Sequence, residues 1–120
     1  MDIKQKLDHE RLDAYDIAVQ LDCAVVSLTR RAGRGHAWLC DQATRASASV
    51  VLNLAEALGR EGLDRARALR IARGSALEVD AALKLLLHRG ACGATERAQA
   101  KELTRRVVAM LTVMRNRAAP

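Results

Sequence analysis

The stretch QATRASASVVLNLAEALGR, residues 42–60, decides the fold. At about 3.6 residues per turn its polar side chains fall in one line along a helix, and the other sides carry mostly Ala, Val and Leu. The line consists of Gln42, Arg45, Ser49, Asn53, Glu56 and Arg60. A helix this apolar is expected to be largely buried, so its polar groups need partners inside the protein or at an interface. We therefore predict a central helix with a narrow polar seam.

Length and composition restrict the chain to one all-α domain. The 120 residues contain no proline before Pro120, and 50% of them are apolar. Phe is absent, and Trp38 and Tyr15 are the only aromatic residues, so Ala and aliphatic side chains must build a core with closely packed helices. A chain of this length forms a single core. No run approaches the ~20 apolar residues of a membrane span, so no membrane partner is expected.

Glycine breaks divide the chain into four helical segments. Within each segment apolar residues recur at intervals of three and four, which is typical of a helix with one buried side. The breaks lie at residues 33–35, 59–62 and 90–93. The predicted helices span residues 8–31, 36–58, 63–88 and 95–117 of one domain, 1–120, with the polar residues 1–7 fraying. Similar lengths and short turns predict an antiparallel up-down-up-down four-helix bundle.

Two residues carry local predictions. Thr95 is expected to cap the fourth helix, because a threonine hydroxyl can accept a hydrogen bond from the first free backbone N–H groups. Gly74 lies inside the third helix, which it weakens by about 1 kcal/mol relative to Ala. A glycine there suggests close approach of a neighbouring helix.

Two motifs resemble a known family. They are Gln42…Arg45-Ala46…Ser49-Val50…Asn53-Leu54-Ala55-Glu56…Gly59-Arg60 and Ala72-Arg73-Gly74-Ser75…Glu78. In order and spacing they resemble the small proteins encoded in intervening sequences of bacterial 23S ribosomal RNA genes, over residues 12–117. The chain departs from that pattern at Val51 and Ala57, where the family usually has Pro and Gly.

The resemblance implies properties that the residues alone do not give. It implies a bacterial four-helix bundle that assembles as a ring, commonly a homopentamer. It also implies a connection with nucleic acid, through the genomic setting of the family. The same family is distantly similar to the accessory variability proteins of diversity-generating retroelements, which bind nucleic acid and a reverse transcriptase.

The polar groups of the second and third helices are interpreted as a structural network rather than a catalytic site. Its predicted members are Arg45, Ser49, Asn53, Glu56, Ser75 and Glu78. Arg45 and Glu78 are expected to form its ion pair and to fix helix register or subunit pairing. Glu56 lies near the turn and Glu78 about three turns from it, too far apart to act on one atom. With no nucleophile, base and orienting group together, we predict a protein that is not an enzyme and needs no cofactor.

Basic residues suggest a nucleic-acid surface. The net charge of +6 is uneven, since residues 84–117 hold eight basic and two acidic side chains. The candidate contacts are Arg30, Arg31, Arg34, Arg97, Lys101, Arg105 and Arg106, with Arg65, Arg67, Arg70 and Arg73 on the third helix as further basic groups. Binding through such groups would depend on salt and tolerate many sequences. Solvated surface arginines are the simpler reading, because charge alone names no partner.

The cysteines and histidines allow one metal alternative. Cys23, Cys40 and Cys92 are odd in number without a Cys-x-x-Cys pair, which fits a reducing cytoplasm. His36 and Cys40 are four residues apart, as are His88 and Cys92, and an antiparallel hairpin would bring these ends together. A zinc site is thus conceivable, but core cysteines and surface histidines explain the residues as well, so no metal is predicted.

The sequence therefore predicts a non-enzymatic protein whose first partner is itself. RNA or DNA is the second partner that its charge suggests. The alternative is a protein-binding adaptor or assembly scaffold that binds no nucleic acid.

Overall fold

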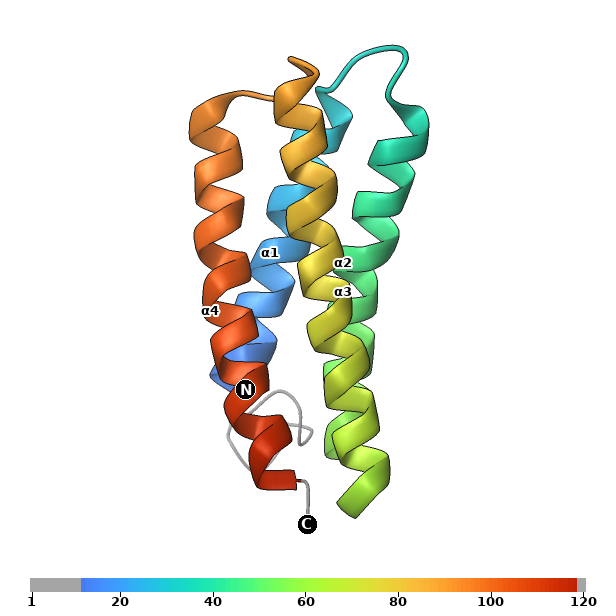
Figure 1. Ribbon diagram of the computed structural model, residues 1–120, viewed down its shortest axis with the longest axis vertical. Coiled ribbons are helices and arrows are strands. Elements are labelled where there is room, and N and C mark those ends of the chain that lie inside the picture. Colours follow the sequence, from blue (N-terminus) through green and yellow to red (C-terminus); the bar gives the residue numbers. More distant parts are fainter. Residues whose placement is uncertain (1–11, 119–120) are drawn as a thin grey trace, which may run out of the picture.

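The computed structural model describes residues 12–118, which form four α-helices joined by short turns (Figure 1). They are α1 (Asp13–Arg30), α2 (Ala37–Leu58), α3 (Gly62–His88) and α4 (Ala94–Ala118). The predicted bounds of the last three helices agree to within one residue at each end. Residues 1–7 and the predicted helical residues 8–11 lie outside the described residues, and Leu12 precedes α1 in an extended conformation. None of these four helices is long and apolar enough to cross a membrane.

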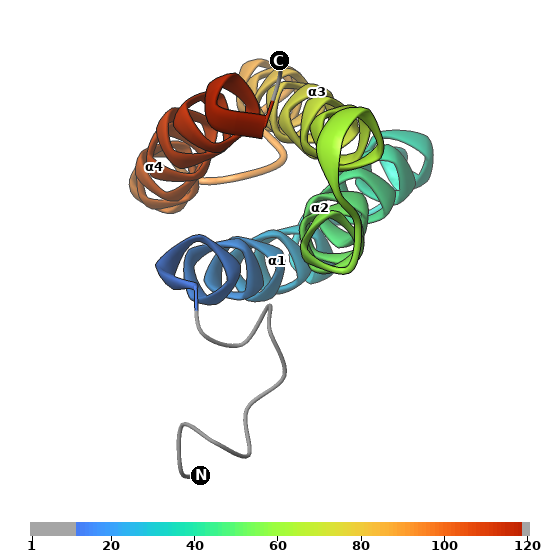
Figure 2. The ribbon, with the colours of Figure 1, turned by 90° about the horizontal axis from the view of Figure 1, so that it is seen from below.

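The helices alternate in direction and follow one another around the bundle. In Figure 1, α1 and α3 run upward while α2 and α4 run downward. Figure 2 shows the order around the axis, with α4 returning to lie beside α1. The core agrees with this arrangement, because one buried cluster joins Leu28 near the end of α1 to Leu39 near the start of α2 and Leu86 near the end of α3. The predicted all-α four-helix bundle is confirmed.

Alanine and leucine fill the core. Six leucines are at most 1% exposed, and burying each one stabilises the fold by about 1.5–3 kcal/mol relative to leaving it in water. These are Leu21, Leu54, Leu69, Leu83, Leu86 and Leu111. Between them lie alanines with no exposed surface, such as Ala18, Ala43, Ala57, Ala72 and Ala76. Their small side chains let the helices approach closely, as the composition predicted.

The turn between α2 and α3 is fixed by a glycine and by an arginine that the sequence did not single out for this role. Gly62 has a φ of 55°, a left-handed conformation that other residues adopt only with strain. Arg65 then donates through Nε to the carbonyl oxygens of Ala57 at 3.0 Å and Arg60 at 2.8 Å. These two bonds tie the start of α3 to carbonyl oxygens at and just beyond the end of α2.

Two local predictions are wrong. α4 begins at Ala94, so Thr95 lies inside its first turn, and the Arg97 amide donates to the carbonyl oxygen of Gly93 at 3.0 Å. Gly74 is exposed, and a Cβ added to it would meet no atom within 4 Å. No helix of the described chain therefore approaches α3 closely at Gly74.

Candidate functional site

The polar seam of α2 meets α3 through three half-buried side chains. Ser49 Oγ lies 2.8 Å from Ser75 Oγ, which joins the two helices near their middle. Asn53 donates from Nδ2 to Ser49 Oγ at 3.0 Å and to the Ser49 carbonyl oxygen at 2.9 Å. The three groups form a hydrogen-bonded ladder that fixes the register of α2 against α3.

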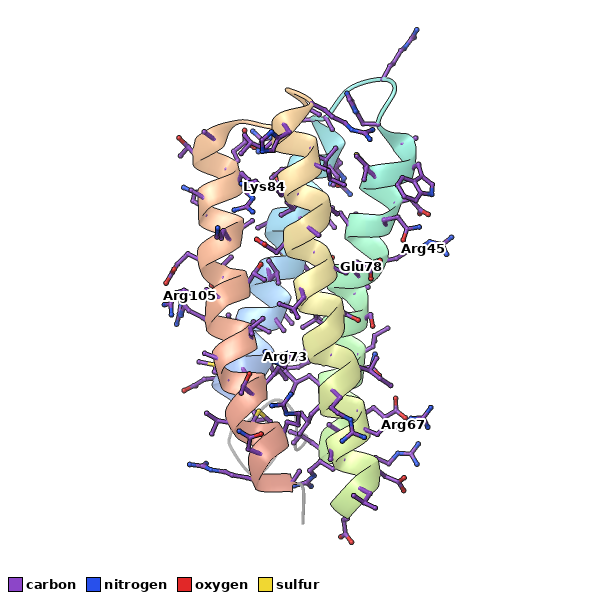
Figure 3. The ribbon with its side chains drawn as sticks, viewed as in Figure 1. Arg45, Arg67, Arg73, Glu78, Lys84 and Arg105 are labelled. Atoms are coloured by element: carbon purple, nitrogen blue, oxygen red, sulfur yellow. The ribbon has the colours of Figure 1, made fainter. Side chains whose placement is uncertain are left out.

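The rest of the predicted network lies in solvent, and the pair between Arg45 and Glu78 is not formed within the described chain. Arg45 Nε instead lies 2.9 Å from the carboxylate of Asp41, with 76% of the Arg45 side chain exposed. Figure 3 shows Arg45 extending away from the bundle at about the level of Glu78, which is also exposed. Glu56 is exposed and pairs with Arg60 at 3.2 Å. Of the six predicted members, only Ser49, Asn53 and Ser75 are therefore half-buried and hydrogen-bonded to one another.

Sequence reasoning missed three polar contacts that tie other helices together. Each joins two neighbouring helices of the bundle. Two of them use arginines, Arg73 and Arg97, that were predicted as basic surface groups. They are Ser47 Oγ donating to Asp22 Oδ1 at 2.6 Å, Arg97 Nη2 donating to Asp80 Oδ1 at 2.9 Å, and Arg73 Nε donating to Thr112 Oγ1 at 2.9 Å. A signal for the first was present, since Ser47 falls at core spacing with Val50 and Leu54.

Arg97 belongs to the contact between α3 and α4 rather than to a nucleic-acid surface. Its side chain is only 6% exposed, and Asp80 is its one carboxylate partner in the described chain. Its Nε is buried and makes no hydrogen bond there. Arg97, Lys101 and Arg105 are four residues apart and were predicted to contact nucleic acid along one side of α4. Arg97 is lost from that set, because a buried paired guanidinium cannot reach a phosphate.

The other basic candidates of α4 are exposed. Lys101 and Arg105 border a shallow groove that reaches Asp80 of α3, and Arg106, the next residue in the chain, is exposed as well. Arg105 donates to the carboxylate of Glu102 from Nε at 2.9 Å and from Nη2 at 2.7 Å. This hydrogen-bonded pair lowers the pKa of Glu102 and raises the pKa of Arg105. Figure 3 places Arg105 on the outer side of α4, where Glu102 neutralises part of its charge.

The remaining arginines divide between solvent and contacts inside the chain. Around the first turn Arg30, Arg31 and Arg34 are all exposed, and Arg31 forms an ion pair with Glu96 of α4. On α3, Arg65 and Arg73 are used in the contacts described above. Arg67 and Arg70 are exposed.

The four zinc candidates do not come together. Cys40 Sγ lies 3.7 Å from the Thr29 carbonyl oxygen, so this thiol is directed towards α1. Burial raises the pKa of Cys40 and of Cys92, which favours the neutral thiol over the thiolate that zinc binds. His36 is half-buried and His88 exposed. Residues 12–118 contain no group of three or more His, Cys, Asp or Glu side chains that could hold a metal ion, so the zinc alternative is not supported.

The fold and the seam together define a class of protein, a small four-helix bundle whose buried and half-buried polar side chains join its helices to one another. The family model of the 23S rRNA-intervening sequence proteins matches residues 10–113, and the chain belongs to that family. This match confirms the resemblance drawn from the motifs of α2 and α3. A comparison with curated proteins found no significant match.

Proposed function

We propose that the protein is a non-enzymatic, self-assembling four-helix bundle that forms a homopentameric ring and binds nucleic acid electrostatically. The observation that carries the proposal is the exposure of large apolar side chains around a core that is already filled. Trp38 is 70% exposed, Leu52 67% and Leu63 65%. The packing of one chain leaves these large apolar side chains in water, so they are available to bury against a second copy. The ring and its five copies follow from the family resemblance.

The nucleic-acid part of the proposal is supported by the net charge and by the basic groups that remain free. Arg30, Arg34, Lys101 and Arg106 are exposed and form no ion pair within residues 12–118. Each copy in an assembly contributes the same set, so weak phosphate contacts add up through avidity. With so few aromatic side chains, base stacking contributes little, and sequence preference should be low.

The non-enzymatic part is supported by what the polar groups of the seam already do. Ser49, Asn53 and Ser75 are engaged in hydrogen bonds between or along helices. A hydroxyl held in this way by a neutral partner is not activated as a nucleophile, which requires an adjacent general base. The exposed, free thiol of Cys23 and the half-buried thiols fit a reducing cytoplasm.

Titration of labelled RNA and DNA at about 50 mM and about 200 mM salt tests the nucleic-acid proposal. We expect affinity that falls steeply with salt and differs little between scrambled sequences. Lys101→Gln and Arg106→Gln should each weaken binding and reduce the salt slope by about 1. Gln20→Glu, on the exposed side of α1, lowers the net charge equally and is the control. If all three variants weakened binding equally, net charge alone would explain the binding, and Lys101 and Arg106 would not be specific phosphate contacts.

The alternative is a protein-binding adaptor or assembly scaffold, and one observation favours it. Three of the predicted phosphate contacts already have carboxylate partners, since Arg31 pairs with Glu96, Arg97 with Asp80 and Arg105 with Glu102. The same titration separates the two proposals. Absence of binding at the lower salt concentration would remove nucleic acid and leave the scaffold.

A further inference from the structure

Basic side chains stand on the side of α3 that borders α4. Arg70, Leu77 and Lys84 are seven residues apart, a spacing that places them on one side of the helix. All three are exposed, and neither basic residue forms an ion pair within residues 12–118. Figure 3 shows Lys84 where α3 lies next to α4. These three residues form the α3 row.

Two contacts show that the α3 row lies beside α4. Arg73 and Asp80 each stand three residues after a member of the row, and residues three apart are neighbours on a helix surface. Arg73 donates to Thr112 of α4 at 2.9 Å, and Asp80 accepts from Arg97 of α4 at 2.9 Å. Leu77 itself lines the shallow groove between the two helices.

The α4 side of this groove adds further positive charge. Lys101 and Arg105 line it together with Val108. Asp80 is the one carboxylate among the lining residues, and the buried guanidinium of Arg97 already pairs with it. The groove is therefore positively charged along both helices.

Between the basic side chains the floor of the groove is apolar. Leu77 is 47% exposed there, and Val108 is half-buried. The hollow has a volume of about 190 Å³, less than the roughly 300–1,000 Å³ of most small-molecule pockets. An amphipathic helix needs several apolar anchors in its groove, and this floor offers two side chains. It suits a flat apolar group that belongs to an anionic chain.

We infer that this groove binds one strand of nucleic acid, with phosphates on the basic side chains and an unpaired base against Leu77 and Val108. The inference rests on the proposed nucleic-acid binding, and it names the site and the form of the ligand. A single strand exposes the faces of its bases, whereas a duplex keeps them stacked inside. Positively charged grooves that follow the backbone are typical of proteins that bind single strands. The α3 row extends about 21 Å, the length of about six stacked nucleotides.

Titration with a labelled single strand of about twelve nucleotides, and with its duplex, tests the inference at about 50 mM and about 200 mM salt. Charge alone favours the duplex, which has more phosphates per unit length. We expect the single strand to bind several-fold more tightly. Lys84→Gln should weaken its binding and reduce the salt slope by about 0.7, the value of one single-strand phosphate contact. Arg67→Gln removes the same charge from an exposed position of α3 that borders α2, and should leave the slope unchanged.

Leu77→Asn tests the apolar floor. It changes no charge, so it should weaken single-strand binding several-fold at both salt concentrations and leave the salt slope unchanged. Leu85→Asn is the control, because Leu85 is 46% exposed on the same helix but does not line the groove. Circular dichroism and mass measurement confirm that each variant keeps the wild-type fold and assembly.

Each outcome decides a different claim. Weaker single-strand binding in Lys84→Gln and Leu77→Asn, but not in Arg67→Gln and Leu85→Asn, supports the groove. Equal or tighter binding of the duplex, or equal effects within each matched pair, overturns the groove and leaves electrostatic nucleic-acid binding standing. Equal competition by polyglutamate of the same charge would show that any acidic chain fills the groove, and it overturns the base contact. Absence of binding by both forms at the lower salt concentration overturns the groove and the nucleic-acid proposal together.

Discussion

At the scale of single residues, Glu102 controls how much charge α4 presents. Its carboxylate holds Arg105 by two hydrogen bonds, and this arginine lowers the pKa of Glu102, so the carboxylate stays ionised well below neutral pH. Glu102→Gln removes the negative charge and releases Arg105. We expect nucleic-acid affinity to rise several-fold at low salt, measured by fluorescence anisotropy. Glu61→Gln makes the same change of charge in the α2–α3 turn, and an equal gain there would contradict the local explanation.

The pair between Arg97 and Asp80 makes a prediction about stability. Asp80→Ala leaves a guanidinium that is almost fully buried without a carboxylate. Removing one partner of a buried pair is costly, and we expect the free energy of unfolding to fall by about 3 kcal/mol in urea denaturation. The control is Asp41→Ala, which removes the exposed partner of Arg45 and should cost less than about 1 kcal/mol. Similar losses for both variants would show that burial of Arg97 does not decide the effect.

Which charged residues pair with which could not be predicted from the sequence. Arg45 could pair with Glu78 of α3 or with Asp41 of its own helix. It pairs with Asp41, as is common for oppositely charged residues four positions apart on a helix. Arg97 was assigned to a solvent-facing stripe because it precedes Lys101 and Arg105 at intervals of four. The competing signal was its core spacing with Ala100 and Thr104, both buried. The rotation of α4 about its axis decides between these patterns, and packing against α3 sets that rotation.

At the scale of the elements, the glycines determined the helix boundaries, and the sequence predicted them closely. Gly33 and Gly90 adopt positive φ at or just after helix ends, as residues without a Cβ do most readily. The hydroxyl ladder was also predictable in part, because Ser49 and Asn53 lie one turn apart on a seam. The contacts of Arg65 were not, since they depend on the path of the turn.

Gly74 provides a test at this scale. It is helical and exposed, and a Cβ there meets no atom within 4 Å. Gly74→Ala should therefore raise the free energy of unfolding by about 0.5–1 kcal/mol, chiefly by restricting the unfolded chain. Gly62→Ala should instead destabilise, because Gly62 has a φ of 55°. Loss of stability in Gly74→Ala, measured by thermal unfolding, would indicate that another surface covers this position.

At the scale of the whole molecule, regularly spaced apolar residues of the four helices build the core. Two kinds of exposed surface take no part in that core. One consists of the exposed basic residues Lys101 and Arg106 of α4, and the other of exposed apolar residues of α2 and α3, among them Trp38, Leu52 and Leu63.

The sequence predicted the four helices, because they follow from the periodicity of apolar residues, and the assembly of several copies stays a prediction that the family resemblance implies. The sequence analysis paired Arg45 with Glu78 because they stand at about the same level on neighbouring antiparallel helices. That level does not show whether the two side chains point towards each other or into solvent. Only the three-dimensional structure shows that the side chains of Arg45 and Glu78 lie in solvent. Each helix also carries exposed apolar residues seven positions before and after its charged residue.

The central claim is that this chain does not act alone. Light scattering after size-exclusion chromatography, over a wide range of protein concentrations, measures it directly. The account predicts a mass of at least two 13.1 kDa chains. A mass of one chain throughout the range would contradict it.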